Sequence, residues 1–204
     1  MKASPKKLLP LILFGIAVTS LFSVQPVQAY IVTLDQVGAN VVATGSGPIN
    51  LMGLTFNGSF FSSNQAAVTG GGGIIQTGPT GFVSADLYSG FSGPASFGTG
   101  GVFFANTGSG DFVGIDGTGS LVVPHGYVSG AALSDSMTFD NATIHSLGLT
   151  PGTYVWTWGS GVPNQNFTLI IGSGVAGVPD GGSTVSLLGF ALLGLAAFRR
   201  KLRC

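Results

Sequence analysis

The sequence has no glutamate and almost no positive charge outside its two ends. All 7 basic residues lie before residue 8 or after residue 198, and all 7 acidic residues are aspartates. Residues 30–178 therefore hold six aspartates and no lysine or arginine. Without cations this segment cannot neutralise phosphates, which excludes a nucleic-acid-binding protein, and it lacks the lysine that a P-loop requires. The same absence predicts a body without internal salt bridges.

Disulfides are also excluded as a source of stability. The single cysteine is Cys204, so no intramolecular bridge can form. No cofactor-binding motif stands out either, and we expect no cofactor.

Glycine is abundant, with 35 residues in 204, and 15 phenylalanines accompany it. Interior glycines disfavour helices by about 1 kcal/mol each relative to alanine, whereas short strands with tight turns suit this composition. The aromatic content argues against disorder. We therefore predict an all-β protein in which residues 30–171 form a single antiparallel β-sandwich or jelly-roll-like domain.

Alternating side chains support this prediction. Val83, Ala85 and Leu87 share one face of a predicted strand, and Phe167, Leu169 and Ile171 share a face of another. About ten strands are expected, at 30–34, 40–43, 49–56, 73–76, 82–89, 102–105, 111–115, 120–123, 137–144, 153–159 and 166–171. Turns are expected at 45–47, 78–79, 116–117, 124–126 and 151–152.

Residues 1–29 have the pattern of a secretory signal peptide. A lysine-containing start precedes an apolar run from Leu8 to Val24, and small or modest residues, Val27 and Ala29, occupy positions −3 and −1. The pattern predicts export through the Sec translocon and cleavage between Ala29 and Tyr30.

The C-terminal end carries a second pattern in three parts. A glycine-rich linker at 172–178 leads to Val178, Pro179, Asp180, Gly181 and Gly182. An apolar helix is predicted at 184–198, and a basic cluster follows it, formed by Arg199, Arg200, Lys201 and Arg203. Fourteen apolar residues give a helix of about 21 Å, so it can cross the ~30 Å hydrocarbon core only as a thin or transient span. The basic cluster should stay on the cytoplasmic side.

This tail at 179–204, together with Val178 directly before it, carries the VPDGG sequence and resembles the PEP-CTERM sorting signals, in particular their VPDSG-type variant. Gly181 stands where that variant usually has serine. The resemblance implies a secreted bacterial protein whose tail is recognised by exosortase, a membrane-embedded processing enzyme. Val178, Pro179, Asp180 and Gly181 map onto the recognition motif. The implied destination is the cell surface or the extracellular matrix, with exopolysaccharide as a possible partner.

Three groups of side chains are candidates for chemistry in the body. Asp111 and Asp116 flank a glycine-rich segment and are weak candidates for a Ca²⁺ site, although both also suit ordinary turns. A hydrolytic triad would need His125 or His145, but no nucleophile elbow is present and surface histidines are the simpler interpretation. The sequence therefore predicts a protein that is not an enzyme.

Tyr154, Trp156 and Trp158 share one face of a predicted strand. If exposed, they would form a platform on which sugar rings could stack, as in a carbohydrate-binding module or adhesin. If buried, they would contribute to the core of the sandwich, and we favour this second interpretation.

Overall fold

In the computed structural model, residues 29–62, 66–117 and 119–172 can be described. The predicted signal peptide before Ala29, and the predicted linker, helix and basic cluster after Gly172, lie outside these residues. Within the described residues no helix is long and apolar enough to cross a membrane.

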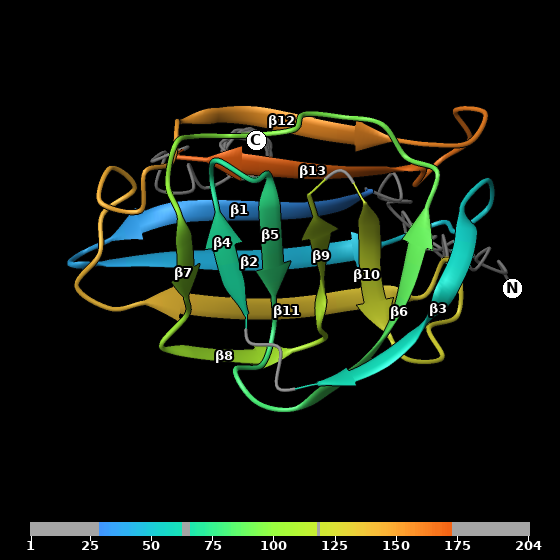
Figure 1. The fold of residues 1–204 in the computed structure, drawn as a ribbon, viewed down its shortest axis with the longest axis horizontal. Helices are drawn as coiled ribbons and strands as arrows, with labels where there is room; N and C mark the ends of the chain where they lie inside the picture. The colour runs from blue at the N-terminus through green and yellow to red at the C-terminus, as the bar shows by residue number, and fades with distance from the viewer. Residues whose placement is uncertain (1–28, 63–65, 118, 173–204) are drawn as a thin grey trace, which may run out of the picture.

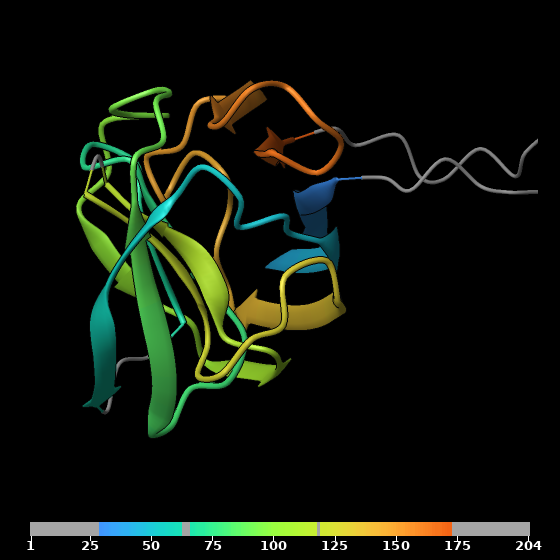
Figure 2. The same cartoon turned by 90° about the vertical axis from the view of Figure 1, so that its right-hand side faces the viewer.

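The described chain forms two β-sheets packed face to face, and the strands of one cross those of the other (Figure 1, Figure 2). This confirms the prediction of an all-β sandwich. One sheet has six strands in the order β12-β13-β1-β2-β11-β8. They are β1 (Tyr30–Val37), β2 (Asn40–Pro48), β8 (Thr107–Gly110), β11 (Ala132–Phe139), β12 (Gly152–Thr157) and β13 (Asn166–Ile171).

The second sheet has seven strands in the order β3-β6-β10-β9-β5-β4-β7. They are β3 (Thr55–Ser62), β4 (Ala67–Thr69), β5 (Ile74–Thr77), β6 (Val83–Ser89), β7 (Val102–Phe104), β9 (Val113–Asp116) and β10 (Ser120–Pro124). Strands that follow each other in the sequence, such as β9 and β10, pair through a tight turn at Gly117. Others, such as β6 and β10, are neighbours only because of the topology.

One pairing differs from the predicted antiparallel arrangement. β1 pairs in parallel with β13, with Tyr30 beside Phe167 and Leu34 beside Ile171. All other strand pairs in the described residues are antiparallel. A parallel pair needs a long connection, and here it is almost the whole body.

The core lies between the two sheets and receives the inward side chain of every second residue. In β13 the buried residues are Phe167, Leu169 and Ile171, as the alternation predicts. Trp156 meets the rings of Phe97 and Phe167 edge-on, at centroid distances of 6.2 and 5.8 Å. These aromatic contacts join β12, β13 and the loop before β7 into one apolar cluster.

Several local predictions are wrong, and two of them concern β2 and the segment after it. Residues 45–47 are not a turn but part of β2, paired with β1 and β11. Gly45 is a glycine in this strand because a side chain there would collide with Tyr30 Oη and Asp135 Oδ1. Residues 49–54 are irregular, and the strand predicted at 49–56 begins only at Thr55. The backbone N–H of Leu51 is held there by the hydroxyl of Ser129 instead of by a neighbouring strand.

Candidate functional site

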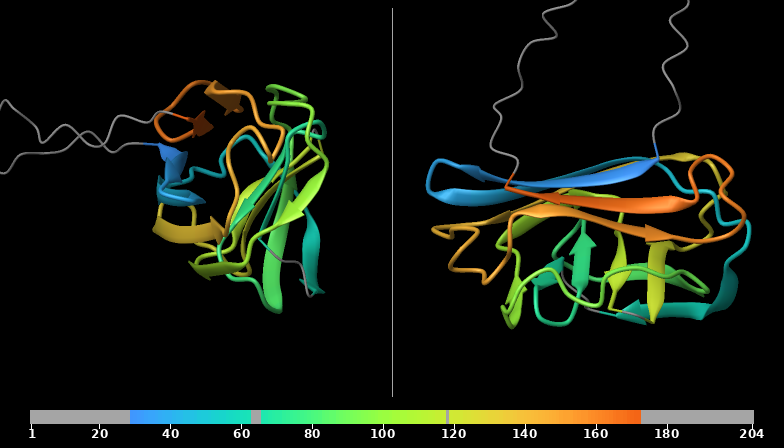
Figure 3. Two further views of the ribbon diagram at one scale, coloured as in Figure 1. Left: turned by 90° about the vertical axis from the view of Figure 1, so that its left-hand side faces the viewer. Right: turned by 90° about the horizontal axis from the view of Figure 1, so that it is seen from above.

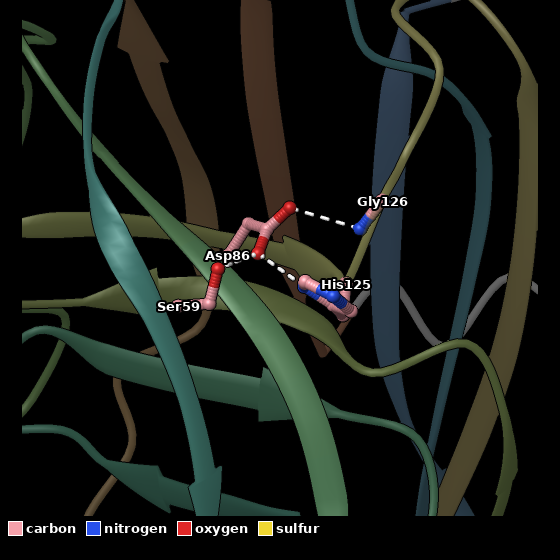
Figure 4. A network of polar contacts seen from close by, with 4 residues as sticks. All are labelled: Ser59, Asp86, His125 and Gly126. Carbon is pink, nitrogen blue, oxygen red and sulfur yellow. Dashed lines mark hydrogen bonds and ion pairs between the residues drawn. The ribbon is translucent and has the colours of Figure 1, made fainter.

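A polar cluster near the surface is built around Asp86 of β6 (Figure 4). Ser59 lies directly opposite Asp86 on β3. On the other side of β6, Val123 of β10 is the partner of Asp86, so the turn that follows β10 places His125 and Gly126 next to it. Three segments that are far apart in the sequence therefore meet at one carboxylate.

Asp86 accepts three hydrogen bonds. Ser59 Oγ donates to Oδ1 over 2.6 Å, and His125 Nδ1 lies 2.8 Å from the same oxygen. The backbone N–H of Gly126 donates to Oδ2 over 2.9 Å. Asp86 is buried, whereas the side chain of His125 is 61% exposed.

Burial alone would raise the pKa of Asp86, but the hydrogen bonds from Ser59, His125 and Gly126 outweigh it and hold the pKa below its ordinary value. The carboxylate is therefore charged at neutral pH. It keeps the proton of neutral His125 on Nδ1, which leaves Nε2 as the free lone pair. If His125 is protonated the contact becomes an ion pair, which the absence of lysine and arginine from the body does not exclude.

The arrangement is not that of a nucleophilic triad. In such a triad the histidine binds both the serine and the carboxylate through different nitrogens, whereas here Ser59 and His125 both bind Asp86. His145 lies in the loop after β11, exposed, and the structure does not bring it to this cluster. The cluster ties the turn after β10 to β6 and β3.

A shallow depression of about 250 Å³ adjoins the cluster, lined by Ser59, Phe60, Phe61, Ser84 and His125. Beside it Phe61 stacks on Phe82, with ring centroids 5.6 Å apart, and both rings are largely exposed. Sequence reasoning missed this site, because nothing in the spacing of Ser59, Asp86 and His125 indicates that β6 lies between β3 and β10.

The two calcium candidates are not brought together. Asp111 precedes β9 and its carboxylate accepts the backbone N–H of Ser134 over 2.8 Å, while Asp116 ends β9. In the described part of the chain no three histidine, cysteine or acidic side chains lie close enough to hold a metal ion.

The stacking platform of Tyr154, Trp156 and Trp158 is not formed. Trp156 and Trp158 are buried and Tyr154 is half-buried, because this face of β12 packs against the core. The indole N–H groups donate inward, from Trp156 to the carbonyl of Pro94 and from Trp158 to that of Asn50. The interpretation as core residues is confirmed.

The predicted processing site is visible in part. Tyr30 opens β1 and its side chain is completely buried, while Ala29 is half-buried. The Tyr30 hydroxyl donates to Asp135 Oδ2 and lies 3.4 Å from Thr77 Oγ1. A chain that begins at Tyr30 therefore keeps the whole of β1.

The tail was compared with models of known protein families. Residues 177–202 match the VPDSG-CTERM motif. The C-terminal end thus carries a PEP-CTERM-like sorting signal, and the predicted recognition residues 178–182 fall inside it. No curated protein and no solved structure matches the chain.

The VPDSG-CTERM motif begins at residue 177, soon after the described body ends at Gly172. Gly172 itself still belongs to the body, because its N–H donates to the carbonyl of Leu34 over 2.8 Å. The recognition residues, the predicted helix at 184–198 and the cluster of Arg199, Arg200, Lys201 and Arg203 lie outside the described residues. Such a motif implies processing by a sorting enzyme such as exosortase and suggests export to the cell surface.

Proposed function

We propose that the protein is a non-catalytic component of the bacterial cell surface or extracellular matrix, delivered there by exosortase-type processing of its tail. The match of residues 177–202 to the VPDSG-CTERM motif carries this proposal. The signal-peptide pattern of residues 1–29 adds export through the Sec translocon. The β-sandwich is then the part that remains outside the cell.

The tail has the physical properties that a processing enzyme in the membrane requires. Pro179 restricts its own φ and biases Val178 towards an extended backbone. Gly181 and Gly182 leave the backbone accessible. The helix predicted at 184–198 and the basic cluster after it would hold the segment in the membrane while the enzyme acts.

The absence of a catalytic role is supported by how the body uses its titratable groups. His125 is bound to Asp86, Ser59 is bound to the same carboxylate, and His145 is remote from both. The alternative of a carbohydrate-binding module that uses Tyr154, Trp156 and Trp158 loses its support, because both tryptophans are buried.

Intact-mass measurement of the protein recovered from its native cells tests the proposal. We expect a chain that starts at Tyr30 and ends near Asp180, and any excess mass at that end would identify an attached group. Pro179→Ala combined with Asp180→Ala should leave the tail uncut, whereas Thr184→Ser, just beyond the motif, should be processed normally. A wild-type chain that still ends at Cys204 would overturn exosortase processing.

A further inference from the structure

The outer face of the six-stranded sheet is unusually rich in hydroxyl groups. In each of its strands the residues that alternate with the core residues point outward, and no other strand of the described chain covers them (Figure 3). The outward hydroxyls are those of Thr33, Thr44, Ser46, Thr107, Ser109, Ser134, Ser136, Thr138, Thr153, Thr157 and Thr168. We call this surface the hydroxyl face.

The strand register arranges these groups in rows across the sheet. One row runs from Ser109 through Ser136, Thr44 and Thr33 to Ile170 and Thr153. Neighbouring strands lie about 4.8 Å apart, and outward residues on one strand about 6.7 Å apart. The result is a two-dimensional array of hydroxyl and methyl groups.

Some of these hydroxyls bond to each other, and others are available. Thr33 and Thr44 share a hydrogen bond of 2.9 Å, and Ser109 and Ser136 one of 3.1 Å. Within the described residues the hydroxyls of Ser46, Ser134 and Thr168 have no protein partner. A hydroxyl donates and accepts equally well, so the array matches a ligand that is itself covered with hydroxyls.

The charge of the face restricts the ligand further. Asp35 is the one charged side chain that points outward from the described strands of this sheet, and residues 30–178 hold no lysine or arginine to attract an anion. A polyanion would be repelled by the six aspartates of the body. A neutral ligand needs no cationic side chain and is not repelled by the aspartates.

The middle of the face is hollowed. A depression of about 250 Å³ is lined by Ile31, Thr33, Thr44, Ser46 and Gly47. Its floor combines hydroxyls with an isoleucine, and sugar rings also combine polar edges with apolar C–H faces. Gly47 has no side chain and leaves the depression open.

We propose that the hydroxyl face binds a neutral polysaccharide chain, seated in this depression and hydrogen-bonded along the rows of threonine and serine. The inference rests on the proposed function, which places the body among extracellular polymers. A second copy of the chain is a poorer occupant, because two such faces would bury hydroxyls for little apolar gain. Sheets also twist by about 20° per strand, which a flexible polymer can follow and a flat crystal surface such as ice cannot.

The test uses the exported protein purified from culture, with cellulose, mannan and dextran as neutral probes and alginate as the anionic one. We expect retention on at least one neutral glycan and none on alginate. Thr33→Val together with Thr44→Val keeps the shape and strand preference of the side chains and removes two hydroxyls, so binding should weaken about tenfold. Thr55→Val removes an exposed hydroxyl from β3 of the other sheet and should bind like the wild type.

Several results would overturn the inference. The first is no binding to any of the three neutral glycans, and the second is equal retention on alginate. The third is unchanged binding by the double variant, once its thermal melting confirms that it folds. Dimerisation through the face, seen as a change in sedimentation that the double variant abolishes, would assign the face to a second copy. Tail processing is measured separately by mass, so the inference and the proposed function can fail independently.

Discussion

At the scale of single residues, the most consequential group is the buried carboxylate of Asp135. It lies in the core with Tyr30 and Thr77, and its Oδ1 has no hydrogen-bond partner in the described residues. The Thr77 hydroxyl donates to the carbonyl of Val113 over 3.1 Å, and the Tyr30 hydroxyl donates to Asp135. With a charged carboxylate, no proton lies between Tyr30 and Thr77.

Protonation of Asp135 would complete the chain of donors. The acid could donate to Tyr30, Tyr30 to Thr77, and Thr77 to Val113. Burial, as the largest cause, raises the pKa of Asp135 to about 6 despite the opposing hydrogen bond from Tyr30. Below about pH 6 the neutral acid is therefore the form that the folded protein favours.

This pKa predicts how stability depends on pH. The unfolded carboxyl titrates near 3.9, so between about pH 4 and 6 the folded state binds a proton that the unfolded state has lost. The contribution is complete below about pH 4 and is lost as the pH rises through about 6. We expect Asp135→Asn, whose amide can donate to Tyr30 like the protonated acid, to be about 2 kcal/mol more stable than the wild type at pH 7.

Urea unfolding of both proteins at pH 4, 5, 6 and 7 checks this prediction. The stability difference should grow with pH across the series. Asp140→Asn, which removes an exposed carboxylate after β11, is the control and should follow the wild-type profile. A constant difference between Asp135→Asn and the wild type would show that Asp135 stays charged in the fold.

At the scale of strands and loops, alternation predicted those elements whose faces differ clearly. It located β6 and β13 well, because Val83 and Ala85, or Phe167 and Leu169, alternate with polar residues. Alternation failed where a contact with another strand, and not the local pattern, decides which residue type fits a position. Gly45 looks like a turn residue but is a strand residue that leaves room for Tyr30 and Asp135.

The Asp86 cluster could not be predicted for a related reason. Alternation places Asp86 on the opposite side of β6 from Val83 and Ala85, but the structure buries both sides. Asp86 shares its face with its partner Val123 of the main core, whereas Val83 and Ala85 belong to a second apolar cluster. The burial of Asp86 depends on β3 and β10 as neighbours of β6. Non-local pairing of this kind leaves no periodic signal in a single sequence, whereas the tail motif is contiguous and was predictable.

Two loops pack through glycines, and this contact is testable. The loop before β7 meets the loop before β12, where Thr99 and Gly100 both donate to the carbonyl of Gly148, over 2.9 and 3.0 Å. A Cβ on Gly98 would collide with that carbonyl and lie 2.9 Å from Leu149 Cα, whereas a Cβ on Gly101 would meet nothing within 4 Å.

We expect Gly98→Ala to lower the free energy of unfolding by about 1–3 kcal/mol, because backbone cannot yield as a flexible side chain would. Gly101→Ala, three residues along the same loop, should change it by less than about 0.5 kcal/mol. Thermal and urea melts of the two variants provide the comparison. Equal effects would mean that the loops do not approach as closely as described.

At the scale of the whole molecule, the fold is closed by its two ends. β1, the first strand, lies between β2 and β13, and β13 is the last strand of the body. Tyr30 and Phe167 pair although 137 residues (167 − 30) separate them. Contacts of such long range make folding slow, and β1 cannot pair with β13 until nearly the entire body has been synthesised.

The final prediction follows from this closure. A chain that ends at residue 162 lacks β13, loses the buried side chains of Phe167, Leu169 and Ile171, and exposes the edge of β1. We expect it to be unfolded by circular dichroism and rapidly cut by chymotrypsin, while the full exported chain resists. Trypsin should cut neither chain within residues 30–162, folded or not, because no lysine or arginine is present there. Chymotrypsin resistance of the shortened chain would mean that β1 and β2 form a stable sheet without β13, and closure by the two ends would then not be what holds the body together.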